Sequence, residues 1–332
     1  MPACHAGGRG FESRPVRHYS PNSPLISQAL MSAEISISPP PIEPVVSPLL
    51  LEAGVTLNVL RLDKIHPRLS GNKWYKLKHN LLEFQQRPKL PILSFGGAYS
   101  NHLYALAAAG KILGMKTIGV IRGELPGTLN PVLTFAKEQG MILHSVSRTE
   151  YRRKEQAAFL EQLRSKYGDF HLLPEGGSNA LAIQGCEEIA SLLAWNGGDS
   201  KRLVALCCGT GTTMAGLISG LAKGLAEGVP DVLGISVLKA EGYLQGEVSD
   251  QLKDCENADS INWRVDDSYH CGGYGRTNAA LDSFLLRFED LSRIPIEPVY
   301  TGKLFYALFD LIEKGAIPAG TEVLALHTGG VH

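Results

Sequence analysis

The sequence lacks the cysteine spacings that build metal sites or redox pairs. Its six cysteines include no CxxC pair and no zinc-like grouping, so we expect no metal centre. A reduced, cytoplasmic environment explains such cysteines most simply. The sequence also lacks an excess of either charge. The formal net charge is −1, which provides no overall field for nucleic acid or an acidic membrane. No apolar run is long enough to cross a bilayer.

The composition is that of a turn-rich globular protein, with 44% hydrophobic residues and 36 glycines. A chain of 332 residues is too long for one ordinary core and suits two domains. Residues 1–30 have neither the apolar segment of a secretory signal nor any periodicity. We interpret them as a non-native or disordered upstream segment and Met31 as the start of the working protein. Deleting residues 1–30 should leave activity and melting temperature unchanged.

Short apolar strands alternate with helical patterns along most of the chain. The helix expected over 74–84 has apolar residues at 3–4–3 spacing, which places them on one face. A single helix is expected over 150–166. The continuous apolar strands, which are typical of parallel sheets covered on both faces, are 90–95, 117–121, 202–208, 231–238 and 322–327. The sequence therefore predicts an α/β fold with two sheet-containing lobes.

The loop GTGTT, residues 209–213, lies between a buried strand and a helix. Free backbone N–H groups at a helix start, with Gly209 and Gly211 removing side-chain obstruction, suit a phosphate dianion. The hydroxyls of Thr210, Thr212 and Thr213 add hydrogen bonds. The loop is not a Walker A motif, and Met214 replaces the third glycine of GxGxxG. A tight turn that only caps the helix explains this loop equally well.

The loop GGAYSNH, residues 96–102, repeats this arrangement after another strand. Ser100 is a suitable N-cap, and Asn101 and His102 fall in the first helical turn. Such a helix start suits a substrate carboxylate. Ordinary capping is a strong alternative, and a histidine in a first turn is more often structural.

Two further segments present candidate polar side chains. HCGGYG, residues 270–275, is an irregular loop whose glycines allow the Tyr274 ring to reach a cleft, although packing over a turn is the simpler interpretation. PVYTGK, residues 298–303, precedes an amphipathic helix. Thr301 is its N-cap, a hydrogen-bond partner for a bound molecule, or both.

Three lysines occur in SGNKWYKLKHN, residues 70–80. A Schiff-base lysine needs a pKa lowered by burial or by nearby cations, because only the neutral amine attacks a carbonyl. Lys73 follows Gly71-Asn72 at a helix start and is a candidate for that role. Lys76 and Lys78 fall elsewhere on the helix and are expected to be solvated. Spacing alone favours a surface position for any single lysine.

Seven segments together resemble the fold-type II pyridoxal-phosphate enzymes, and most closely the branch of D-cysteine desulfhydrase and 1-aminocyclopropane-1-carboxylate deaminase. They occur in the family's order over about residues 45–330: GNKWYKL, FGGAYSNH, GGSNALA, CGTGTTMAG, GGYG, PVYTGK and LHTGG. The resemblance implies the tryptophan synthase β-like fold, with two open twisted α/β domains and the cofactor in the cleft. It also implies a small domain of residues 87–183, a large domain of residues 31–86 plus 184–332, and a homodimer.

The resemblance assigns roles by position. It makes Lys73 the Schiff-base lysine for pyridoxal 5'-phosphate and residues 209–213 the phosphate loop. The other implied site residues are Asn72 and His102 near the cofactor ring, Ser100 and Asn101 at the substrate carboxylate, Ser100 in proton transfer, the catalytic tyrosines Tyr274 and Tyr300, and the subclass residues Thr301 and Thr328. Tyr75 departs from the pattern, which usually has arginine there.

Thr301 and Thr328 distinguish the two subclasses. The deaminase pattern has glutamate and leucine at these positions, whereas the desulfhydrase pattern has threonine at both. A threonine hydroxyl donates to a neutral pyridine nitrogen, a weaker electron sink that suits expulsion of a good leaving group. We therefore expect a lyase that converts D-cysteine to pyruvate, hydrogen sulfide and ammonia. The alternatives are a deaminase that forms 2-oxobutyrate, a nucleotide-binding oxidoreductase and a relative without turnover.

Overall fold

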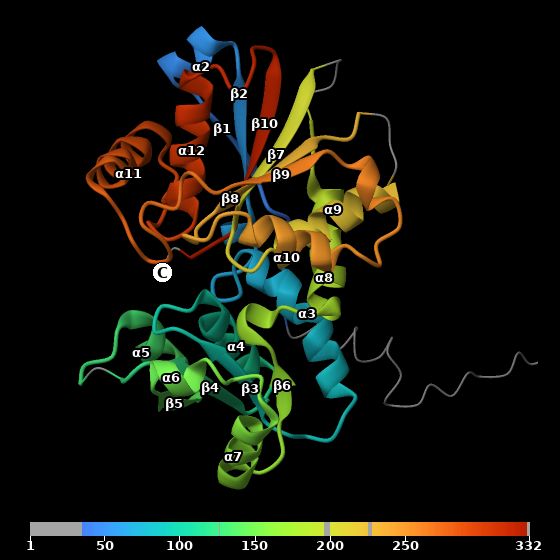
Figure 1. The fold of residues 1–332 in the computed structure, drawn as a ribbon, viewed down its shortest axis with the longest axis vertical. Helices are drawn as coiled ribbons and strands as arrows, with labels where there is room; N and C mark the ends of the chain where they lie inside the picture. Colours follow the sequence, from blue (N-terminus) through green and yellow to red (C-terminus); the bar gives the residue numbers. More distant parts are fainter. Residues whose placement is uncertain (1–34, 126, 196–199, 225–227, 331–332) are drawn as a thin grey trace, which may run out of the picture.

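The computed structural model describes residues 35–125, 127–195, 200–224 and 228–330. The expectation for residues 1–30 therefore lies outside the described residues. Figure 1 shows two sheets, one in the upper and one in the lower half of the molecule, with α3 (Asn72–Gln85) running between them. Helix α3 packs against both α4 (Asn101–Ile112) and α8 (Ala180–Glu187). The elements that carry most candidate residues thus meet where the two sheets face each other.

The larger sheet has six strands in the order β1-β2-β10-β7-β8-β9. Its strands pair in parallel except for β1, which is antiparallel to β2. The bounds are β1 (Ile42–Val45), β2 (Thr56–Arg61), β7 (Lys201–Cys208), β8 (Asp231–Ser236), β9 (Trp263–Asp266) and β10 (Thr321–His327). The continuous apolar strands are therefore buried inside a helix-covered sheet, as their composition predicts.

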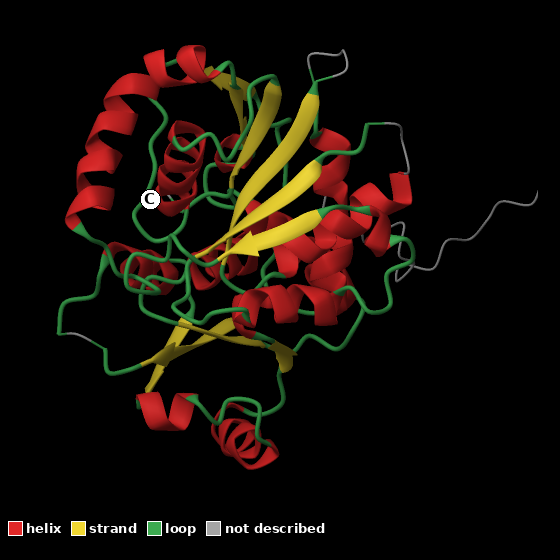
Figure 2. Cartoon of the chain, turned by 45° about the horizontal axis from the view of Figure 1, so that its top comes forward, coloured by secondary structure: helices red, strands yellow, loops and turns green. Residues whose placement is uncertain are grey.

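The smaller sheet has four parallel strands in the order β5-β4-β3-β6. It is the lower yellow sheet in Figure 2. The bounds are β3 (Ile92–Gly96), β4 (Thr117–Arg122), β5 (Ile142–Val146) and β6 (His171–Leu173). The predicted α/β fold with two sheets is confirmed.

Helices cover both sheets and connect their strands. The single helix expected over 150–166 is wrong, because the chain forms α6 and α7 with a turn between them. The remaining helices, with 3-10 helices marked η, are α2 (Pro48–Ala53), η1 (Leu62–Lys64), α5 (Pro131–Glu138), α6 (Arg148–Tyr151), α7 (Ala157–Tyr167), η2 (Glu175–Gly177), η3 (Glu188–Leu192), α9 (Thr212–Gly224), α10 (Tyr243–Gln251), η4 (Ala258–Ser260), α11 (Ala279–Ser292) and α12 (Thr301–Glu313). None of the helices in the described ranges is long and apolar enough to cross a membrane.

Candidate active site

Lys73 lies in the first turn of α3, which is packed tightly onto the end of β10. Gly71 has φ 69, and a Cβ built there would lie 2.0 Å from the Thr328 carbonyl oxygen, so glycine is required. The Asn72 N–H donates to the same oxygen at 3.2 Å. Lys73 is only partly exposed, and burial lowers the pKa of its amine, with Cys207 and Cys186 opposing that effect. A lowered pKa enlarges the fraction of amine able to attack a carbonyl.

Lys76 follows one turn later and is the site residue that the sequence did not indicate. The expectation that it is solvated is wrong, since only 1% of it is exposed. Its Nζ lies 3.1 Å from Thr210 Oγ1 and 3.1 Å from Ser178 Oγ. Residues at i and i+3 share a helix face, so Lys76 points into the interior from the same side as Lys73. Lys78, partly exposed, forms an ion pair with Glu188 at 2.7 Å.

The loop 209–213 joins β7 to α9 and carries three threonine hydroxyls, of which those of Thr212 and Thr213 are buried. Thr210 Oγ1 lies 2.9 Å from Ser178 Oγ and 3.3 Å from Thr212 Oγ1. Asn72 Nδ2 donates to Thr213 Oγ1 at 2.8 Å, which ties the loop to the start of α3. Gly211 has φ 74, and a Cβ on Gly209 would lie 3.1 Å from the Tyr300 ring. Both glycines therefore leave room that a side chain would fill.

The surroundings of Lys76 indicate whether the loop 209–213 suits an anion. Among the described residues no carboxylate pairs with its buried ammonium, which has only the two hydroxyl partners. Burial and the neighbouring charge of Lys73 place the pKa of Lys76 well below its ordinary value. A buried cation without an anionic partner is unfavourable. The lysine, the hydroxyls and the amides at the start of α9 together fit a phosphate dianion.

Ser100 and Asn101 stand at the start of α4. Ser100 is the N-cap, and its Oγ accepts from the Leu103 N–H at 3.2 Å. Asn101 lines a small cavity together with Lys73 and Thr328; the other lining residues are Arg68, Ser70, Tyr104, Ala105 and Gly330. Three of the residues predicted from separate segments thus share one cavity.

His102 points away from that cavity into the protein. It is buried, and its Nε2 lies 2.8 Å from Ser94 Oγ on β3. Its Nδ1 has no hydrogen-bond partner within the described part of the chain. Burial, followed by the charges of Lys73 and Lys76, places the pKa of His102 well below its ordinary value. The ring is therefore neutral and resembles a packed first-turn histidine.

Tyr274, in the loop 270–275, contacts Tyr300, the residue that precedes α12. Their rings make an edge-on contact with centroids 5.9 Å apart. Burial raises the pKa of Tyr300 well above its ordinary value, so its phenol stays protonated. The buried ammonium of Lys303 donates to the Gly273 carbonyl oxygen at 2.8 Å and so holds the Tyr274 loop against α12.

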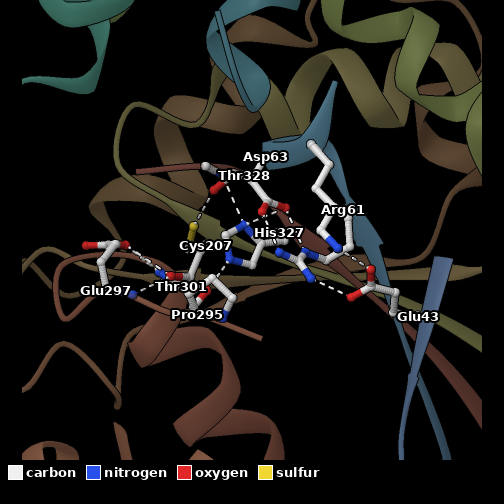
Figure 3. A network of polar contacts seen from close by, with 11 residues as sticks. Glu43, Arg61, Asp63, Cys207, Pro295, Glu297, Thr301, His327 and Thr328 are labelled. Carbon is white, nitrogen blue, oxygen red and sulfur yellow. Dashed lines mark hydrogen bonds and ion pairs between the residues drawn. The ribbon is translucent and has the colours of Figure 1, made fainter. Parts of the chain in front are cut away.

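The two subclass threonines have different surroundings (Figure 3). Thr301 Oγ1 accepts from the Glu297 N–H at 3.0 Å and donates to Glu297 Oε1 at 3.3 Å. Thr328 Oγ1 lies 3.1 Å from Cys207 Sγ, and burial raises the pKa of that thiol to about 12. Thr328 lines the cavity beside Lys73, whereas the Thr301 hydroxyl is occupied by Glu297.

A family model described as "Pyridoxal-phosphate dependent enzyme" matches residues 46–329, which is most of the chain. The protein therefore belongs to this family of pyridoxal-phosphate-dependent enzymes. The predicted enzyme class and cofactor are confirmed. A solved structure described as a 1-aminocyclopropane-1-carboxylate deaminase homologue superposes with a TM-score of 0.75 at 22% identity. That match covers 92% of this chain and 95% of the other, and it shows the fold alone.

Curated relatives carry the names of two activities. The bifunctional D-cysteine desulfhydrase/1-aminocyclopropane-1-carboxylate deaminase of Arabidopsis thaliana is 28% identical, with 85% of this chain and 74% of the relative covered. A D-cysteine desulfhydrase of Salmonella schwarzengrund is also 28% identical, with 82% and 86% covered. A Pyrococcus horikoshii protein provisionally named 1-aminocyclopropane-1-carboxylate deaminase is 26% identical, with 84% and 86% covered.

Proposed function

We propose that this protein catalyses β-elimination and deamination of a small amino acid, and that D-cysteine is its substrate. The products would be pyruvate, hydrogen sulfide and ammonia. The observation that carries this proposal is the placement of two lysines one turn apart on α3. Lys73 lines the cavity with Asn101 and Thr328, and Lys76 is buried against the loop 209–213. The relatives named D-cysteine desulfhydrase support the choice of substrate.

In this proposal, the phosphate is held by Lys76 and by the amides and hydroxyls of residues 209–213. Asn72 keeps that loop in register with the start of α3 through its 2.8 Å bond to Thr213. Thr328 supplies the hydroxyl for the ring nitrogen, because the Thr301 hydroxyl is engaged by Glu297. When bound, pyridoxal phosphate supplies the electron sink that stabilises negative charge at the substrate Cα.

The side chains around the cavity would divide the remaining work. Lys73, with its lowered pKa, attaches the cofactor and then takes the proton from the substrate Cα. Ser100 and Asn101 orient the substrate carboxylate at the start of α4. The raised pKa of Tyr300 keeps its O–H available to donate to the departing thiolate. Tyr274 orients that phenol through their ring contact.

The test is a direct comparison of two reactions of the purified protein. Sulfide from D-cysteine and 2-oxobutyrate from 1-aminocyclopropane-1-carboxylate should be measured in parallel, and we expect sulfide to dominate. The double change Thr301→Glu with Thr328→Leu should move the ratio toward 2-oxobutyrate. A wild-type ratio that already favours 2-oxobutyrate would support the deaminase function, which relatives' names also carry.

Borohydride reduction tests the assignment of Lys73. Reduction of the yellow wild-type protein should fix the cofactor to a peptide containing Lys73. Lys73→Ala should retain no label, and Lys78→Ala is the matched control, since Lys78 pairs with Glu188. A label on another lysine would refute the assignment, and a wild-type protein without pyridoxal phosphate would refute the function.

We further propose the division into a small domain of residues 87–183 and a large domain of residues 31–86 plus 184–332. The four-stranded sheet lies wholly within the first range and the six-stranded sheet within the second, which supports this division. A cytoplasmic homodimer completes the proposal. Light scattering of the eluted protein should give twice the mass of the 35.8 kDa chain.

A further inference from the structure

A chain of charged side chains lies where β2 and β10 end side by side (Figure 3). Arg61 is the last residue of β2, Asp63 lies in η1, and His327 is the last residue of β10. Only 2% of Arg61 and none of His327 is exposed. Glu43 on β1 pairs with Arg61 from the outer, partly exposed side.

Polar contacts link these residues in series from Arg61 to Pro295. Arg61 forms a bidentate ion pair with Asp63: Nε donates to Oδ1 at 2.9 Å and Nη2 donates to Oδ2 at 2.6 Å. Asp63 Oδ1 lies 3.2 Å from His327 Nδ1. His327 Nε2 lies 2.7 Å from the Pro295 carbonyl oxygen. The chain thus links the guanidinium on β2 to the backbone that precedes α12.

The Pro295 contact places a proton on Nε2 of His327. A carbonyl oxygen only accepts, so Nε2 must carry the proton that is donated to it. Asp63 Oδ1, 3.2 Å from Nδ1, is also an acceptor, so the Asp63 contact holds the ring when Nδ1 carries a proton as well. Burial lowers the pKa of His327, and the Asp63 carboxylate opposes that effect. Both ring nitrogens are therefore occupied, one by each neighbouring segment.

His327 is joined to two backbone segments near the candidate cavity, the one at Thr328 and the one that precedes α12. It directly precedes Thr328, whose carbonyl oxygen accepts the Asn72 N–H one residue before Lys73. Its Nε2 holds the segment at Pro295, two residues before Glu297, which in turn occupies the Thr301 hydroxyl. A rotation of the imidazole would displace the Thr328 hydroxyl and the start of α3 together.

Stability alone does not explain the choice of charged residues here. Replacing a buried ion network with apolar side chains of similar volume is often neutral or stabilising. Such a network instead fixes a single arrangement of the segments that it joins, because its hydrogen bonds are directional. A cofactor site needs its contacting groups held within fractions of an ångström, which is the property that this network supplies.

We propose that His327, held by Asp63 and Arg61, is a positioning residue that sets the Thr328 hydroxyl and the first turn of α3 for the bound cofactor. This inference rests on the proposed function. It assigns to the Arg61–Asp63–His327 network a role in cofactor geometry, and it does not make any of the three a catalytic residue.

The test compares matched variants of the full-length protein. His327→Leu removes both polar contacts, whereas His327→Gln keeps a donor that reaches Pro295. Asp63→Asn keeps the shape of the carboxylate and removes its charge. Glu43→Gln changes the outer, partly exposed end of the network and is the control. The readouts are the dissociation constant for pyridoxal phosphate, the absorption maximum of the bound cofactor and the separate kcat and KM for D-cysteine.

We expect His327→Leu to weaken binding of pyridoxal phosphate on the order of 10- to 100-fold and to shift its absorption maximum, since small displacements of contacting groups have effects of that size. His327→Gln should recover most of the affinity, and Glu43→Gln should leave affinity and spectrum unchanged. If His327→Leu does not fold, Asp63→Asn takes its place, with the same direction of change expected.

The inference is overturned if His327→Leu or Asp63→Asn lowers only the melting temperature and leaves the affinity, spectrum and KM at wild-type values. It is also overturned if Glu43→Gln changes the spectrum as much as His327→Leu does. A wild-type protein that binds no pyridoxal phosphate would instead refute the proposed function. A wild-type protein that binds it without releasing sulfide would refute the substrate and leave the positioning role testable by affinity and spectrum.

Discussion

Each of the two sheets ends a central strand in a glycine-containing loop that leads straight into a helix, yet the two loops have different surroundings. In the large sheet, Thr212 and Thr213 of the loop 209–213 are buried, and the more exposed Thr210 contacts the buried Nζ of Lys76. In the small sheet, the loop 97–100 is open, with Tyr99 67% exposed and Ser100 only partly buried. The same strand–loop–helix pattern therefore produces a loop in contact with a buried lysine in one lobe and an accessible helix start in the other.

The difference shows that a glycine loop at a helix start does not define a binding site by itself. The side chain that a remote element places against the loop also decides what can bind. Loop 209–213 receives a cation from α3, which is remote in sequence, through the contact of Lys76 with Thr210. Beside the other loop, Lys73 and Arg68 line the cavity that Asn101 shares. A loop that contacts a buried, fixed lysine suits a ligand that stays bound. An open helix start suits a ligand that enters and leaves in each turnover. The following predictions test this division.

The largest effect should come from Lys76→Met. A hydrogen bond to a charged partner contributes about 1.5–3 kcal/mol, so affinity for pyridoxal phosphate should fall roughly 10- to 100-fold. The cofactor-free protein should not lose thermal stability, because the change replaces a buried amine that burial already disfavours as a cation with an apolar side chain. Titration of the cofactor followed by its absorbance measures the first effect and calorimetry the second. Lys78→Met is the control, and equal losses in both variants would contradict the role of Lys76.

A smaller effect is expected from Gly211→Ala. Gly211 has φ 74, and an added Cβ would lie 2.8 Å from Val248 Cγ2, so the change should destabilise the protein by about 2 kcal/mol. Gly97→Ala in the other loop has open space around it and should be close to neutral. Chemical unfolding of both variants measures the contrast. Equal destabilisation would show that the two loops are equally enclosed.

The pH dependence of stability should report on His102. Its pKa is well below 6.5 in the folded protein, chiefly through burial, so the unfolded chain binds more protons as the pH falls below that value. Its contribution to stability is fully present above pH 6.5 and is lost on acidification, by up to about 1.4 kcal/mol per pH unit. His102→Gln should therefore show a shallower fall of melting temperature between pH ~7 and ~5 than the wild type. Parallel curves would contradict the burial of a neutral ring.

Ser100→Ala should have the smallest effect on stability, about 1 kcal/mol from loss of the N-cap of α4. Because this loop is assigned to the substrate, KM for D-cysteine should rise while affinity for pyridoxal phosphate stays the same. Ser100→Asp provides the sharper comparison: it restores the cap but places a negative charge beside the substrate carboxylate. Recovered stability with a still higher KM is expected. A normal KM in both variants would remove Ser100 from the substrate site.

Local sequence patterns and the order of motifs predict much of the architecture. They do not predict features that depend on contacts with residues distant in the sequence. The apolar strands and the loops 96–102 and 209–213 are local features, and the structure contains the corresponding strands and helices. The strand β1 was not predicted, because its four residues include a proline and only pairing with β2 makes them a strand. The break between α6 and α7 likewise interrupts an acceptable helical composition.

The lysines show the same limit at the site. Lys73 was selected because it follows Gly71-Asn72 in a segment that resembles a known motif. Lys76 was expected to be solvated, since nothing beside it in the sequence indicates its partners, Thr210 and Ser178. The sequence also does not predict the partner of the Thr301 hydroxyl. That hydroxyl bonds to Glu297, and the contact depends on how the backbone folds between the two residues. Burial and pairing of polar groups follow from tertiary contacts, which periodicity does not report.

The position of β10 has a consequence for the order in which the protein assembles. The last strand in the sequence is inserted between β2 and β7, so the large sheet stays in two separate halves until β10 has been synthesised. The start of α3 then receives its anchor at Thr328 only after residue 328 has been synthesised. Because such pairing joins distant parts of the chain, we expect it to be a slow, late step of folding. A ribosome-bound chain that stops before residue 321 would carry Lys73 without the surroundings that lower its pKa and would not yet retain the cofactor.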